Sequence, residues 1–236
     1  MKRQLAKLAI TLGISLEMCC ALAGSAAAQA KIQIGCTATS DCASAMIAVD
    51  EGIFRKHGLD VEMTPIAINS NIPAAILSNS IQIGGPTSTV FLQAVDGGLD
   101  LVGIAGASVM NTTSNNAITA FVRNGITINE PKDFVGKKVG APGLNAFLHV
   151  LFVKWLMDKG VDPKSVTFIE VSFPTMNDIL KSGAVDAVLA GEPFITRFST
   201  AGTGTAAFRY LQELNRTEPV IFYAASRPCR SRSQGP

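Results

Sequence analysis

The feature that most constrains the fold of this 236-residue chain is a repeating order of strand, polar loop and helix. In the first half, strands are predicted at residues 31–35, 59–68, 81–84 and 101–105. A first helix is predicted from its N-cap at Asp41 to residue 50, and further helices are predicted over 72–80 and 90–97. This order predicts a mostly parallel α/β sheet with helices on both faces.

The second half repeats the same order. Its strands are expected at 118–123, up to Gly140, at 166–171 and at 184–189, and its helices at 147–159 and 176–182. We interpret residues 31–119 as one lobe and residues 120–218 as a second. Residues 118–123 would cross between them, and residues 219–226 would return. Two such lobes around one cleft form a clamp.

The loops at the strand ends are rich in Ser, Thr, Asn and Gly. In parallel sheets, ligands bind at the carboxyl ends of the strands beside helix N-termini. Backbone donors at helix starts suit anionic or strongly polar ligand groups. The pattern therefore indicates a binding surface rather than a catalytic centre.

Composition narrows the class of partner. The chain is 47% hydrophobic and 16% charged, and its 20 Lys and Arg nearly balance its 18 Asp and Glu. Without a basic stripe, and with only 6% aromatic residues for stacking on bases, nucleic acid is not an expected partner.

The first thirty residues have the pattern of a signal peptide. Basic residues at the start precede an apolar stretch at 8–22, and Ala28-Gln29-Ala30 forms a cleavage site before Lys31. A retained anchor is the weaker reading because the stretch is short and contains Glu17. A lipoprotein site at Cys19 fits poorly, because Glu and Met stand where small residues are expected. We expect export to the periplasm, without stable membrane insertion after cleavage.

Cys36 and Cys42 lie close together in a chain expected to reach an oxidising compartment. A small disulfide loop and a pair of buried free thiols both remain open. His57 and His149 have no partners at the spacing of a zinc site, so we expect neither a metal nor another cofactor.

Three segments, 48–62, 133–140 and 181–187, occur together and in order. Through them the chain resembles the solute-binding proteins of the nitrate/sulfonate/taurine group, which share an SsuA/THI5-like (NMT1-like) domain with thiamine-pyrimidine synthesis proteins. The resemblance implies a type II periplasmic binding fold. It also implies a monomer that binds a small molecule and works with an ABC permease and ATPase.

By the same resemblance, ligand contacts fall on the loops identified above. The residues implied are Thr39, Ser40, Asp41, Thr87, Ser88, Leu144, Asn145, Ala146, Phe173, Pro174, Glu192 and Pro193. Ordinary turn and cap roles remain open for each of them. If Asp41 and Glu192 both face the cleft, they disfavour a simple anion and suit a ligand with an amine or amidine-like donor. Arg123 and Arg197 are weaker candidates for holding an anionic group.

The last ten residues, 227–236, depart from the family pattern because they have no apolar periodicity. We expect a disordered tail and a first lobe that lacks its closing helices. Either a frameshift or premature stop near residue 227, or a natural short variant, would explain it.

Three other functions compete with solute binding. An enzyme related to thiamine-pyrimidine synthesis shares the fold, but its cysteine-rich iron motif is missing here. A hydrolase that pairs Cys36 or Cys42 with His149 lacks an orienting group. A periplasmic sensor would need a fused signalling segment. The sequence favours a binding protein that is not an enzyme.

Overall fold

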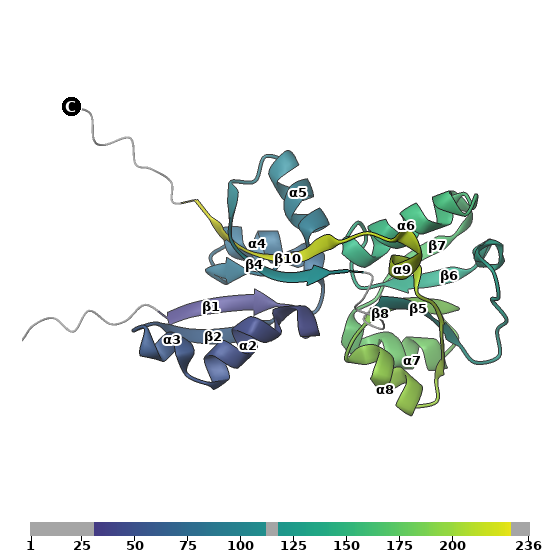
Figure 1. The fold of residues 1–236 in the computed structure, drawn as a ribbon, viewed down its shortest axis with the longest axis horizontal. Coiled ribbons are helices and arrows are strands. Elements are labelled where there is room, and N and C mark those ends of the chain that lie inside the picture. The colour runs from purple at the N-terminus through teal and green to yellow at the C-terminus, as the bar shows by residue number, and fades with distance from the viewer. Residues whose placement is uncertain (1–30, 112–117, 228–236) are drawn as a thin grey trace, which may run out of the picture. The chain divides into compact units, whose positions relative to one another are not determined.

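The computed structural model describes residues 31–111 and 118–227. Its strands form two five-stranded sheets, named here sheet A and sheet B, with helices against both faces of each (Figure 1). The fold class expected from the sequence is therefore confirmed. The segments expected to be a signal peptide, residues 1–30, and a disordered tail, after residue 227, lie outside the described residues.

Sheet A has the strand order β2-β1-β3-β10-β4. Its strands are β1 (Lys31–Cys36), β2 (Asp60–Pro65), β3 (Ile83–Gly84), β4 (Leu101–Met110) and β10 (Glu218–Ser226). Its helices are α2 (Ala43–Asp50), α3 (Ile53–Lys56), α4 (Ile72–Leu77) and α5 (Ser88–Asp96), with short 3-10 turns η1 (Ser40–Cys42) and η2 (Asn69–Asn71) before α2 and α4.

Sheet B has the order β7-β6-β8-β5-β9. Its strands are β5 (Ile118–Arg123), β6 (Lys138–Ala141), β7 (Thr167–Glu170), β8 (Ala187–Gly191) and β9 (Gly204–Phe208). Its helices are α6 (Phe147–Asp158), α7 (Met176–Lys181), α8 (Phe194–Thr200) and α9 (Tyr210–Leu214), with 3-10 turns η3 (Pro131–Phe134), η4 (Pro163–Ser165) and η5 (Phe173–Thr175).

The sheets are mixed where the sequence predicted mostly parallel strands. β1 pairs with β3, and β6 with β7 and β8, in parallel. β10 runs antiparallel to β3 and β4, and β5 runs antiparallel to β8 and β9. The chain enters sheet B through β5 and returns to sheet A through β10. These two strands therefore run in the opposite direction to the strands of the strand-helix repeats.

The sequence analysis assigned no elements between Phe194 and residue 217, where the structure has α8, β9 and α9. These elements are short, between 5 and 7 residues, and their pattern is too brief for periodicity to mark them. Tertiary contacts fix them. Tyr210 is fully buried, and its hydroxyl donates to the carbonyl of Leu148 at 3.3 Å.

Part of the core of sheet B is an aromatic cluster that α6 forms with its neighbours. Phe134 packs edge to face on Phe152 at a ring-centroid distance of 5.1 Å, and Phe152 stacks on Trp155 at 5.3 Å. Trp155 donates its Nε1 hydrogen to Glu213 of α9 at 3.0 Å. A cluster of this kind holds α6 rigidly, which matters because the start of α6 forms one side of the candidate site.

Candidate functional site

One cavity is lined by residues of both sheets' connecting loops. Four of its residues lie just after parallel strands. Thr37 and Pro142 come directly after β1 and β6, and Thr87 and Phe173 come a few residues after β3 and β7. The other lining residues are Thr39, Asp41, Asn69, Ala146, Phe147, Leu148, Val220 and Ile221. Carboxyl ends of parallel strands are where α/β proteins bind ligands. The cavity volume is only about 20 Å³, room for about one water molecule.

Asp41 supplies the cavity's charge. It lies in η1, and its carboxylate Oδ1 accepts a hydrogen bond from Ser108 Oγ of β4 at 3.0 Å. Burial raises the pKa of Asp41, although the hydroxyls of Ser108 and Thr39 partly offset this. The expected N-cap role for Asp41 is wrong, because the N-cap of η1 is Thr39 and a 3-10 turn stands between the loop and α2.

Two threonines and one asparagine complete the polar side of the cavity. Thr39 is 6% exposed, and its Oγ1 makes no well-aligned hydrogen bond among the described residues. Asn69 is fixed, because its amide nitrogen donates to the carbonyl of Gly85 at 3.3 Å and its Oδ1 accepts from the Thr87 backbone N–H at 2.8 Å. Asn69 thus joins the loop after β2 to the loop after β3.

A disulfide closes the loop after β1. Cys36 and Cys42 are bonded across a sequence separation of six, and both are buried. The disulfide packs against the loop after β3, since a Cβ on Gly85 would stand 2.5 Å from Cys36 Sγ. The loop carrying Thr37, Thr39 and Asp41 is therefore held at both of its ends. Because both sulfurs are in this bond, neither Cys36 nor Cys42 is a free thiol that could pair with His149 as a nucleophile.

The start of α6 forms the opposite side of the cavity. Asn145 has a left-handed φ of 63°, which asparagine tolerates better than most residues. Its backbone N–H donates to His149 Nδ1 at 2.9 Å, and the N–H of Leu144 donates to Glu170 Oε2 at 3.0 Å. Burial lowers the pKa of His149. Two backbone donors before α6 are thus already used by protein side chains.

The structure brings together five of the twelve residues implied by the resemblance. Thr39, Asp41, Thr87, Ala146 and Phe173 line the cavity. Pro174 lines a separate cavity beside α7 and α8, and Glu192 lines another beside β5 and β9. The remaining five are not part of the lining and lie in adjoining loops and turns or, for Ser88, at the first position of α5: Ser40, Ser88, Leu144, Asn145 and Pro193.

Glu192 touches the other side of the site through its backbone. Its carbonyl accepts a bond from the Ser40 N–H at 3.4 Å, while its carboxylate accepts bonds from the backbone N–H and hydroxyl of Thr196. The charge of Glu192 is therefore placed on the first turn of α8.

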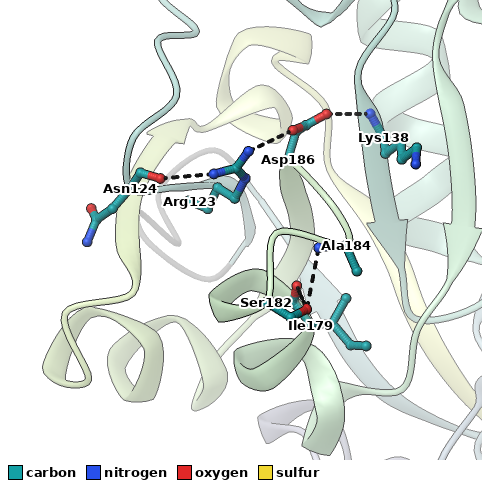
Figure 2. Close-up of polar contacts among 7 residues, drawn as sticks. All are labelled: Arg123, Asn124, Lys138, Ile179, Ser182, Ala184 and Asp186. Atoms are coloured by element: carbon teal, nitrogen blue, oxygen red, sulfur yellow. Dashed lines mark hydrogen bonds and ion pairs between the residues drawn. The ribbon is translucent and has the colours of Figure 1, made fainter.

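Arg123 has a structural partner (Figure 2). Its Nη2 lies 3.5 Å from Asp186 Oδ1, and Asp186 Oδ2 accepts the backbone N–H of Lys138 at 2.9 Å. Asp186 belongs to the segment 181–187 that carries the family resemblance, and it ties β5 to β6. Arg197 stands over the ring of Phe194 at 5.7 Å in the separate cavity beside α7 and α8.

Sequence reasoning missed seven lining residues and one partner. The lining residues are Thr37, Asn69, Pro142, Phe147, Leu148, Val220 and Ile221. The partner is Ser108, which donates a hydrogen bond to Asp41. Thr37 and Pro142 stand in loops that the strand pattern marked. Val220 and Ile221 belong to β10, which sequence treated as a returning strand alone, and only the sheet order places it beside β3 and β4.

Two other properties bear on the kind of site. In residues 31–111 and 118–227, no group of three or more His, Cys, Asp or Glu side chains is arranged to hold a metal ion. None of the helices in these same ranges is long and apolar enough to cross a membrane.

A family model described as NMT1/THI5 like matches residues 39–214, which is most of the chain. The chain belongs to the NMT1/THI5-like family. Among curated proteins, none matches this sequence significantly.

Solved structures share the fold of this NMT1/THI5-like chain. The alkanesulfonate-binding protein SsuA of Xanthomonas axonopodis pv. citri is 20% identical with a TM-score of 0.72, over 86% of this chain and 67% of that one. The periplasmic aliphatic sulphonate-binding protein SsuA of Escherichia coli is 18% identical with a TM-score of 0.64, over 84% and 65%. This chain thus spans about two thirds of the length of these proteins.

A third structure has the same fold with a different ligand class. The periplasmic nitrate-binding protein NrtA of Synechocystis is 18% identical with a TM-score of 0.65, over 83% of this chain and 55% of that one. At identities this low, the comparisons establish the fold but not the ligand. The ligand class must be argued from the residues of this chain's own cavity.

Proposed function

We propose that this chain is the substrate-binding subunit of an ABC importer and captures a small polar organic solute in the cavity between its two lobes. The observation that carries the proposal is the lining of the cavity. Loops after the parallel strands of both sheets meet there, and they bring a carboxylate, hydroxyls and aromatic rings together. Family membership and the fold shared with sulfonate- and nitrate-binding proteins support it.

Capture would work by closure of the lobes, residues 31–119 and 120–218. A ligand that contacts residues of both lobes favours the closed arrangement by its differential affinity for it. Because the cavity holds only about 20 Å³, a solute enters after the lobes separate. β5 and β10 are the strands by which the chain enters sheet B and returns to sheet A, so we place the hinge beside these two strands.

The solute class proposed here is the broad one that the family and the shared fold suggest. A polar organic molecule, sulfonate-, taurine- or nitrate-like or bearing an amine, would meet Asp41, Thr39 and Thr87 on one side and Phe147 and Phe173 on the other. The role is transport rather than catalysis. The bound form would be delivered to a membrane permease and its ATPase.

The compartment belongs to the same proposal. Cleavage after Ala30 would release a monomer that begins at Lys31 in the periplasm, where the Cys36–Cys42 disulfide is stable. N-terminal sequencing of the protein recovered from the periplasm checks this point. A protein retained in the cytoplasm with its first residues intact would contradict it.

Thermal unfolding with a panel of solutes tests the function. The panel contains sulfonates, taurine, nitrate, aromatic acids, amides and aminopyrimidines. A solute that binds the folded state at 100 times its Kd adds about 2.7 kcal/mol to the free energy of unfolding, so the midpoint rises. A folded protein that none of these solutes shifts would contradict the proposal.

A matched pair of variants places the effect in the cavity. Ala146 is 3% exposed and lines it, so Ala146→Leu fills space that the solute needs and removes the shift. Ala184 is exposed on the loop before β8, so Ala184→Leu leaves the shift intact. Loss of the shift in both variants would place binding elsewhere.

A further inference from the structure

The charge and the donors of the cavity lining bear on which solutes can enter. Asp41 is the charged residue of the lining, and none of the described lining residues is Lys, Arg or His. Arg123 and Arg197, the two basic residues considered as anion holders, are engaged by Asp186 and placed over Phe194. A simple oxyanion entering this space would meet a negative charge without a basic side chain to offset it.

Three backbone donors of the sheet A loops are already used by the protein. The Thr39 N–H donates to the Thr37 carbonyl at 2.8 Å, and the Ser40 N–H donates to the Glu192 carbonyl. The Thr87 N–H donates to Asn69 Oδ1. These three N–H groups, two at the start of η1 and one just before α5, are therefore not available to an anion.

The acceptors in the same loops have capacity to spare. A carboxylate has about four lone-pair sites, and Ser108 uses one of those on Asp41 Oδ1. Thr39 Oγ1 is buried on the same wall of the cavity at 6% exposure; it interacts with Asp41, lowering the pKa of that carboxyl, but makes no well-aligned hydrogen bond within the described residues. A buried hydroxyl without a well-aligned partner is unfavourable, so a ligand that pairs with it recovers the cost of its desolvation.

We propose that the solute carries an ammonium- or amidinium-type group, which Asp41 and Thr39 hold, and that simple oxyanions such as nitrate and alkanesulfonates are not its ligands. This inference rests on the proposed function, because it names the ligand class of the same cavity. A zwitterion is included as long as its cationic end meets Asp41. Phe147 and Phe173 line the cavity too and offer apolar contact for the rest of the molecule.

Probe pairs of matched shape and opposite charge test the inference. These are guanidinium against nitrate, ethylammonium against ethanesulfonate, and benzamidinium against benzenesulfonate, each titrated calorimetrically into the purified protein. At least one cationic member is expected to bind about tenfold more tightly than its anionic partner, as loss or gain of a charge-assisted hydrogen bond predicts. An anionic member that binds as tightly as its cationic partner, or more tightly, overturns the inference while the proposed function stands.

Two variants assign the binding to the named side chains. Asp41→Asn is expected to weaken the cationic probe about tenfold or more, because it removes a charge-assisted hydrogen bond. Thr39→Val keeps the shape, removes the hydroxyl beside Asp41 and is expected to weaken the probe several-fold in a protein that still melts cooperatively. Asp178→Asn, the same change at an exposed carboxylate in the separate cavity beside α7, leaves binding unchanged.

The remaining outcomes separate the two proposals. Cationic binding that is unaltered by Asp41→Asn in a protein with a cooperative melt overturns the assignment to Asp41. If no member of any pair binds to the folded protein, and the wider solute panel also fails to shift its melt, the proposed function fails together with the inference. If an uncharged or anionic solute of that panel binds instead, the inference alone fails.

Discussion

Ser108 donates its hydroxyl to Asp41 at 3.0 Å, which joins β4 to the turn after β1 across 67 positions of sequence. The bond places a partly buried carboxylate at the cavity wall. Ser108 therefore positions the group that gives the cavity its charge, although Ser108 itself is not one of the residues lining it.

Asp41 should make the stability of the protein fall with rising pH. Burial raises the pKa of its folded form above the ordinary value of 3.8, so the folded state holds the proton more tightly than the unfolded state. Between these two pKa values the free energy of unfolding falls as pH rises. Asp41→Asn removes this fall. Urea unfolding of both proteins should be measured at neutral pH and near pH 3.8. The free energy of unfolding of the variant, relative to that of the wild type, should be higher at neutral pH than near pH 3.8.

Asp178→Asn serves as the control for the pH experiment. Its carboxylate is exposed on α7, so this variant shows what the loss of one carboxylate outside the cavity does at both pH values. A wild type that gains stability relative to Asp41→Asn as the pH rises would contradict the burial argument.

The disulfide should contribute to stability by restricting the unfolded chain. A loop as short as the one between Cys36 and Cys42 is expected to contribute about 2 kcal/mol, and a double change to Ser should remove it. Chemical unfolding in oxidising and reducing buffer measures the effect. Reductant should destabilise the wild type and leave the double variant unchanged. Equal stability of the wild type in both buffers would show that the bond contributes nothing.

Gly85 should be intolerant of a side chain because it packs against the same disulfide. A Cβ at this position would meet Cys36 Sγ at 2.5 Å and Cys42 Sγ at 3.1 Å. Gly85→Ala forces the disulfide or the loop after β3 to move, and overpacking of this kind costs about 1–3 kcal/mol. Gly106→Ala is the matched control, because a Cβ at that position would have nothing within 4 Å. Equal melting midpoints for the two variants would contradict the packing.

Asp186 should hold sheet B together at the ends of β5 and β6. Asp186→Ala leaves the Lys138 N–H and the Arg123 guanidinium without their carboxylate, at a cost of about 1–3 kcal/mol. Asp186→Asn keeps an acceptor for Lys138 and should cost less. Urea unfolding compares the two. This result would show that Asp186, in the segment 181–187, supports folding rather than ligand contact. An Asp186→Ala variant with the full stability of the wild type would refute this.

The aromatic cluster of α6 and its neighbours should be the most sensitive part of sheet B. Phe152 is fully buried between Phe134, Trp155 and Tyr210, so Phe152→Ala should cost about 3–5 kcal/mol. Leu92→Ala, at a side chain that is 62% exposed, should change stability by about 0.5 kcal/mol or less. Thermal unfolding compares the two variants with the wild type. Similar losses in both would show that the cluster does not support the fold.

The sequence by itself determined the alternation of strands and helices and the loops where a ligand could bind. The strand at 118–123 was predicted with the bounds that the structure gives. Such features depend on neighbours within a few positions, and local patterns record them. The three motif segments likewise carried the family, since their residues stand in the sequence itself.

Only the tertiary structure decided which loop residues meet. Glu192 and Asp41 both stand in or beside polar loops, yet Asp41 lines the cavity while Glu192 turns back to Thr196. Ser108, Val220 and Ile221 reached the site through the pairing of β4 and β10, whose register no local pattern specifies. Contacts between distant segments depend on the packing of whole sheets, so the charge of the cavity and its buried hydroxyl become visible only after the chain has folded.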